Sequence, residues 1–114
     1  MKNKTTLTQT EVEFLESFLC CCFETGGSTY WISKVESDAE SYHSQTFSDD
    51  PDGWIKIYDG EQEEWHELTA EKMLEGINKV IKYKSIEDDD AGNYDNGDAD
   101  CAMQHAIFGE VIYG

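Results

Sequence analysis

Carboxylates are the residues of this chain whose types and spacing suggest chemistry most directly. They concentrate in three blocks, residues 49–52, 61–67 and 87–100. The segment from Ser48 to Asp59 partly imitates a calcium-binding EF-hand loop. However, Ser stands where such a loop needs its first acid, Asp replaces the final Glu, and the flanking residues are typical of strands. We therefore expect no specific metal site and no cofactor.

Histidine and cysteine, which often carry out catalysis, are not arranged for it here. His43, His66 and His105 fall on three different predicted elements. Residues 20–22, all Cys, lie within a predicted helix among acids that would raise the thiol pKa. The chain has neither a nucleophile elbow nor a Gly-rich phosphate loop. We interpret these cysteines and Cys101 as small thiols of a reducing cytoplasm, and predict that the protein is not an enzyme.

The charge balance excludes two classes of partner. The 114 residues carry 25 Asp and Glu against 8 Lys and Arg, a net charge of −17, and all of the cations are Lys. Direct binding to nucleic acid or to an anionic membrane would bring like charges together. The chain also lacks Arg, whose guanidinium group binds phosphate through two parallel hydrogen bonds. Because 39% of the residues are apolar and 12% are aromatic, we still expect a folded chain.

Aromatic residues interrupt the acidic blocks, a combination typical of a protein interface. Carboxylates one helical turn apart, or on alternate strand positions, lie about 5–7 Å apart, near the spacing of phosphates along a nucleic-acid strand. Rings among them would supply affinity while the charge steers association, so we expect a basic protein as the partner. The predicted partner-binding residues are Asp49, Asp50, Asp52, Trp54, Tyr58, Glu61, Glu63, Glu64, Trp65, Glu67, Asp88, Asp89, Asp90, Tyr94 and Asp95.

Apolar residues at helical spacing dominate the first part of the chain. A capping box fits residues 10–13, with residues 8–11 as a second register, and the helix would end at Gly26-Gly27. Residues 29–36 are rich in β-branched and aromatic side chains and predict a strand. Residues 37–53 are polar and predict a surface loop. The candidate anchors of that loop are Tyr42, His43 and Phe47.

Residues 54–68 predict a β-hairpin, for which two registers compete. A two-residue turn at Asp59-Gly60 would oppose apolar and polar side chains on one face. A four-residue loop at residues 60–63 would instead place Ile57 opposite His66. We prefer the longer loop because strand alternation strongly penalises a wrong register.

Two more helices follow the hairpin. Thr69 is a good N-cap for the first of them, and after a predicted loop at about residues 85–97 either Asn96 or Asp98 could cap the second. The order helix, strand, strand, strand, helix, helix predicts a single small α+β domain over residues 1–114, with a three-stranded antiparallel sheet packed against three helices. The longest apolar run, residues 18–23, is too short to cross a bilayer.

Three parts of the chain also resemble small acidic proteins encoded by bacteriophages and prophages. They are residues 26–31, residues 65–77, and residues 98–100 with 104–114. Many small acidic phage proteins counter host defence, including anti-CRISPR and anti-restriction proteins that imitate nucleic acid. Since the resemblance points to a class and carries no functional motif, it implies no catalytic residue.

These observations lead to one principal hypothesis. The chain would be a phage-encoded inhibitor in the cytoplasm of a bacterial host, and would block the cationic nucleic-acid groove of a defence nuclease or effector complex by occupying it. Two alternatives stay open: a small-molecule or metal-binding module, and an immunity or antitoxin protein that neutralises a basic toxin. The sequence also leaves a homodimer open.

The net charge makes a first prediction about stability. Carboxylates that repel one another weaken the folded state most at low ionic strength, where screening is weakest. Raising NaCl from about 20 to about 300 mM should therefore raise the melting temperature, measured by circular dichroism. A steady fall over that range would contradict the prediction.

Overall fold

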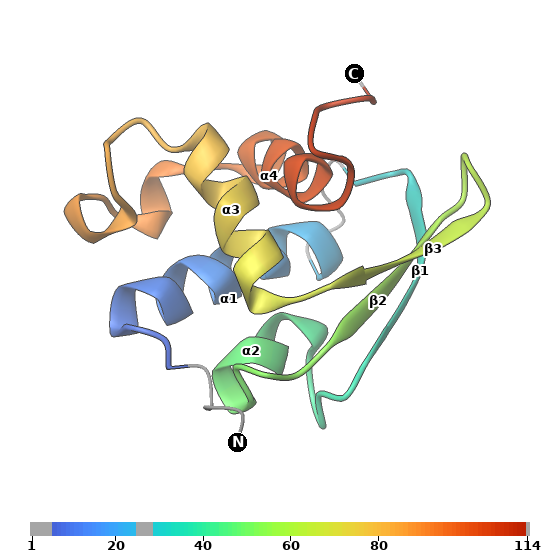
Figure 1. The fold of residues 1–114 in the computed structure, drawn as a ribbon, viewed down its shortest axis with the longest axis horizontal. Helices are drawn as coiled ribbons and strands as arrows, with labels where there is room; N and C mark the ends of the chain where they lie inside the picture. Colours follow the sequence, from blue (N-terminus) through green and yellow to red (C-terminus); the bar gives the residue numbers. More distant parts are fainter. Residues whose placement is uncertain (1–5, 25–28, 114) are drawn as a thin grey trace.

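A three-stranded antiparallel sheet, in the order β1-β2-β3, forms one side of the molecule. The strands are β1 (Ile32–Ser37), β2 (Ile55–Asp59) and β3 (Glu64–Leu68). The α-helices are α1 (Gln9–Phe23), α2 (Thr46–Asp49), α3 (Ala70–Val80) and α4 (Asn96–Phe108). The computed structural model describes residues 6–24 and 29–113. It confirms the predicted α+β class and antiparallel sheet, and α1, α3 and α4 lie together on one side of the sheet (Figure 1).

The β2–β3 hairpin has the predicted register with the longer loop. Ile57 lies opposite His66, and Ile55 lies opposite Leu68. Ile55, Ile57 and Leu68 are all 0% exposed and face the helices as part of the core. A register shifted by one residue would turn these side chains to solvent, so their burial fixes the pairing.

A buried carboxylate, Asp59, joins the hairpin loop to the C-terminal segment. It accepts the N–H groups of Glu61 at 2.8 Å and Gln62 at 3.1 Å, and the hydroxyl of Tyr113 at 2.7 Å. Burial and the hydrogen bond to Asp59 raise the pKa of Tyr113 to about 12, so its hydroxyl remains a donor near neutral pH. The buried Gln104 side chain accepts the N–H of Tyr113 at 2.8 Å. The segment after α4 therefore folds back against that helix.

Side-chain caps define where the helices begin. Thr8 and Glu11 form the capping box of α1, which is the second of the two predicted registers, and Thr69 caps α3 as predicted. The N-cap of α4 is Asp95, rather than Asn96 or Asp98, because its carboxylate accepts the N–H of Asp98. The predicted end of α1 at Gly26-Gly27 lies outside the described residues. No helix in the described part of the chain is long and apolar enough to cross a membrane.

Two segments predicted as loops contain buried structure. Residues 37–53 include the 3-10 helix η1 (His43–Gln45) and α2, and Phe47 is 0% exposed. Residues 85–97 include the 3-10 helices η2 (Ile86–Asp88) and η3 (Ala91–Asn93) and the start of α4. The surface-loop prediction was wrong for Phe47, because one aromatic side chain in a polar segment is enough to draw that segment onto the core.

Helices α3 and α4 cross unusually closely at Gly76. A Cβ atom built at Gly76 would lie 2.1 Å from the carbonyl oxygen of Ala102 and 3.0 Å from the backbone nitrogen of Ala106. Both distances are to backbone atoms, which cannot move aside as a side chain can. The crossing therefore requires a residue without a side chain at position 76.

Gly76→Ala should strongly destabilise the fold. The added methyl group forces α3 and α4 apart, and overpacking of this kind costs about 1–3 kcal/mol, which outweighs the higher helix propensity of Ala. Urea denaturation measures the loss as a lower midpoint with an unchanged slope. Glu75→Ala, at a neighbouring position on the same helix, is the matched control and should change the midpoint little. Equal stability of G76A and wild type would refute the close crossing.

Candidate functional site

The face of the sheet turned away from the helices carries three of the predicted aromatic anchors. Along β2, Ile55 and Ile57 point into the core, so the alternate positions point outward. Pairing adds side chains from β3 and β1 to the same face, since Lys56 lies between Glu36 and Glu67. We call this surface the outer sheet face. It consists of Lys34, Glu36, Trp54, Lys56, Tyr58, Trp65 and Glu67.

The rings of the outer sheet face pack on one another and on lysine. Tyr58 and Trp65 meet edge to face with their centroids 5.2 Å apart. The ammonium of Lys34 lies 5.0 Å from the centroid of Tyr58, and that of Lys56 lies 5.3 Å from the centroid of Trp54. These two lysines lie over rings, and neither forms an ion pair with a described carboxylate. Trp65 remains 46% exposed, which is high for so large an apolar side chain.

Four acids of the β2–β3 hairpin border this aromatic surface. Glu61, Glu63 and Glu64 lie at its loop end, and Glu67 lies on the face itself. All four are exposed. The carboxylate of Glu64 lies 3.8 Å from Nε2 of His66, a contact that is an ion pair only when His66 is protonated. The carboxylates of Glu61, Glu63 and Glu67 form no hydrogen bond or ion pair with a described residue, although Lys56 is the cross-strand neighbour of Glu67.

The acids before β2 lie at the other end of the same strand. Asp49 ends α2, and the side chain of Asp50 accepts the N–H of Asp52 at 3.0 Å. Trp54 follows after Gly53 and donates its backbone N–H to Asp38 at 3.4 Å. The aromatic residues of β2 therefore have an acidic segment at each end. Among the described residues, no group of three or more His, Cys, Asp or Glu side chains is placed to hold a metal ion.

The third acidic block is separate from the hairpin. Figure 1 shows the segment between α3 and α4 at the opposite side of the molecule from the β2–β3 loop. Tyr94, predicted as an aromatic anchor, is only 9% exposed and packs between Phe14 and Phe18 at centroid distances of 6.2 and 5.6 Å. Its hydroxyl donates to Asp89 and accepts the N–H of Lys82. Tyr94 is thus a core residue, because its ring adds apolar area to α1 while its hydroxyl is satisfied.

The acids of this block are used to hold the chain in place. The carboxylate of Asp95 caps α4, and backbone hydrogen bonds, above all that from Asp98, lower its pKa. Partial burial acts to raise the pKa of Asp89, but hydrogen bonds from Tyr94 and its neighbours outweigh this effect and lower it. Asp90 similarly accepts the N–H of Gly92 at 2.8 Å. These carboxylates have structural partners that the hairpin acids lack.

The histidines and cysteines are not brought into a catalytic arrangement among the described residues. His43 bonds Ser37 at 2.7 Å, while His66 packs on the Phe108 ring with centroids 5.2 Å apart. Burial raises the pKa of each of the four thiols, that of Cys22 most strongly, and nearby carboxylates add to the effect. Raised thiol pKa values disfavour the nucleophilic thiolate, as the sequence predicted.

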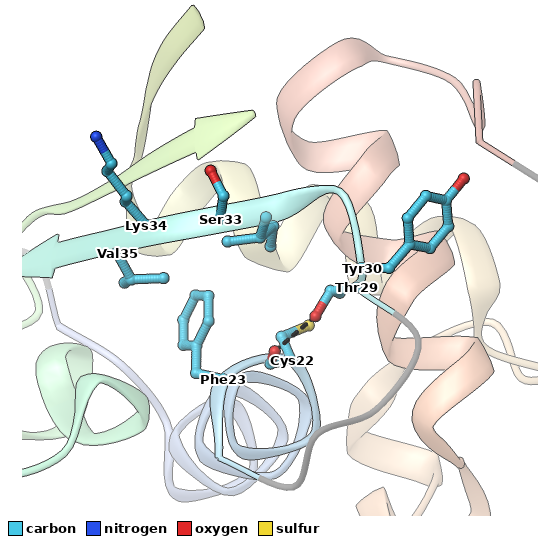
Figure 2. Close-up of a pocket in the computed structure, with 8 residues that line it drawn as sticks. Cys22, Phe23, Thr29, Tyr30, Ser33, Lys34 and Val35 are labelled. Carbon is cyan, nitrogen blue, oxygen red and sulfur yellow. Dashed lines mark hydrogen bonds between the residues drawn. The ribbon is translucent and has the colours of Figure 1, made fainter. Parts of the chain in front are cut away.

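A hollow of about 440 Å³ lies where β1 passes the end of α1 (Figure 2). Thr29 donates its hydroxyl to the carbonyl oxygen of Cys22 at 2.6 Å. Its own carbonyl oxygen accepts the N–H of Ile32 at 3.0 Å in a turn, so β1 begins at Ile32 rather than at residue 29 as predicted. Phe23 and Val35 approach the hollow from opposite sides, whereas Lys34 points away from it.

The sequence could not place Lys34 or Glu36 next to the aromatic residues of the hairpin, because that placement depends on the β1–β2 register.

Comparison with protein-family models, with curated proteins and with solved structures finds no match for this chain. The assignment of a function therefore depends on the geometry of the surface.

The two kinds of carboxylate should respond differently to removal. Asp95→Ala should lower the urea midpoint at neutral pH, because it removes the α4 cap. Since the pKa of Asp95 is lowered, its contribution is present above the ordinary Asp value of 3.8 and disappears as the pH falls through the lower folded value. The difference in urea midpoint between Asp95→Ala and wild type should therefore shrink below that pH.

The triple variant E61Q/E63Q/E67Q should keep or raise the urea midpoint at neutral pH. A clear fall in the midpoint would contradict the absence of hydrogen-bond and ion-pair partners for these three carboxylates.

Proposed function

We propose that the chain is a non-catalytic, phage-encoded inhibitor that occupies the cationic nucleic-acid-binding groove of a bacterial defence nuclease or effector complex. Its place of action would be the cytoplasm of the bacterial host. The observation that carries this proposal is a set of hairpin carboxylates that form no hydrogen bond or ion pair with a described residue, beside the exposed ring of Trp65. A basic groove could neutralise those carboxylates while the rings bury apolar area.

Geometry supports imitation of nucleic acid over a merely solubilising charge. The acids lie on an ordered hairpin and its short loop. Carboxylates on alternate positions of a strand are about 5–7 Å apart, near the spacing of successive phosphates. Solubility of a small domain needs a net charge of only about 2–8 units, well below the −17 of this chain. The excess is therefore available for steering toward a cationic partner.

The structure also favours one acidic block as the contact surface. The side-chain carboxylates of Glu61, Glu63 and Glu67 form no hydrogen bond or ion pair with a described residue. Those of Asp89, Asp90 and Asp95, in contrast, accept hydrogen bonds from backbone or side-chain donors. Neutralising the latter group would cost the fold some of its own stabilisation. We assign Trp65 and Trp54 as anchors, with the hairpin acids as the principal charged contacts.

Competition with nucleic acid tests this proposal. Purified CRISPR effector complexes and restriction nucleases are each loaded with a fluorescent nucleic-acid substrate, and the chain is titrated in while anisotropy is recorded. We expect displacement from at least one of them, with affinity that falls steeply as NaCl rises to about 500 mM. E61Q/E63Q/E67Q and Trp65→Ala should each weaken displacement about tenfold or more, the size of one hot-spot contact.

A charge-matched control separates contact from general electrostatics. E13Q/E40Q/E75Q also removes three negative charges, but from α1, from the segment before η1 and from α3. It should weaken displacement much less than the hairpin variant does. The proposal fails if no target releases nucleic acid, if binding is indifferent to salt, or if the hairpin and control variants behave alike. Binding to a basic toxin instead would favour the antitoxin alternative.

A further inference from the structure

The edge of the sheet formed by β1 is open. Strand β1 pairs with β2 along one side, and its other side receives no backbone hydrogen bond from a described residue. In an antiparallel sheet, alternate N–H and C=O groups of an edge strand point outward, so this edge can bind a further strand. The register shift between Ile32 and Lys34 limits regular pairing to the part of β1 that follows it.

The charges on β1 match those of a second copy of the same strand. Lys34 and Glu36 are exposed and flank Val35. If two β1 strands pair antiparallel about Val35, each Lys34 lies opposite Glu36 of the second copy, and this contact occurs twice. Pairing centred on Lys34 or on Glu36 would instead oppose two like charges. The sequence of the edge therefore selects one register of self-pairing.

Apolar surface lies beside this edge. The hollow between β1 and the end of α1 is lined in part by Phe23, Ile32 and Val35, and Tyr30 at its rim is 62% exposed. Figure 2 shows Phe23 and Val35 on the side of β1 opposite to Lys34. A second copy paired on the edge would cover part of this surface, adding apolar burial to the backbone hydrogen bonds.

We propose that two copies of this chain associate through their β1 edges, antiparallel about Val35, to form one continuous six-stranded sheet. The two-fold axis stands perpendicular to the sheet, so both outer sheet faces point the same way and the proposed binding surface doubles. Because each copy carries a net charge of −17 and the paired segment is short, the dimer is weak and depends on protein concentration. This inference does not depend on the identity of the proposed target.

Reciprocal charge reversal tests both the edge and its register. Wild type should show a concentration-dependent increase in mass toward the dimer by analytical ultracentrifugation at about 0.01–1 mM, a range suited to small interfaces. Lys34→Glu and Glu36→Lys should each be monomeric alone, because like charges then lie opposite each other. An equimolar mixture of the two should recover dimers, since both acids of the first variant then face both lysines of the second. The total charge of that mixed pair equals that of the wild-type pair.

Matched variants separate strand pairing from a general effect of charge. K79E and E75K make the same changes in charge on α3, and neither should alter self-association. Circular dichroism establishes that the reversed variants fold. Hydrogen exchange on wild type gives a readout without mutation, because amides of residues 34–37 should gain protection as concentration rises. Monomeric wild type throughout, dimeric single variants, or a folded mixture that stays monomeric would each overturn the proposal.

Discussion

The contact of Gly76 with the backbone of α4 determines how the rest of the molecule is arranged. Helix α3 follows β3 after one residue, so the position of α3 against α4 also fixes the hairpin. Ile55, Ile57 and Leu68 are buried, so one face of the sheet packs against the helices. The other face is left to solvent, and its rings are held by cross-strand pairing rather than by a second layer. The exposure of aromatic residues on this face is thus a consequence of helix packing on the opposite one.

Carboxylates serve two distinct purposes in this chain. Asp59 and Asp95 accept backbone N–H groups and hold a loop and a helix end, while Asp100 accepts the indole N–H of the buried Trp31 at 2.8 Å. Glu61 and Glu63, by contrast, are exposed, and their side-chain carboxylates form no hydrogen bond or ion pair with a described residue. A count of acids cannot distinguish these groups, yet only the second can exchange water for a cationic partner without weakening the fold.

The sequence predicted the regular parts of the fold and missed those decided by distant contacts. Alternation of Ile55 and Ile57 fixed the hairpin register, and Thr69 marked the start of α3, because both signals are local. The burial of Phe47 and Tyr94 could not be predicted, since each occupies space between elements far apart in the chain. For the same reason the sequence identified Trp54, Tyr58 and Trp65 as candidate anchors but not Lys34, which β1 places over Tyr58.

The distribution of the tryptophans has a practical consequence. Trp31 is fully buried, donates its indole N–H to Asp100 and stacks on Tyr113 with centroids 5.6 Å apart. Trp54 and Trp65 lie on the outer sheet face, and Trp65 is largely open to water. Intrinsic fluorescence therefore combines a constant emission from the core with a solvent-sensitive emission from the candidate surface. Any partner that covers this face shifts the solvent-sensitive emission alone. Its binding can therefore be followed by intrinsic fluorescence without an attached dye.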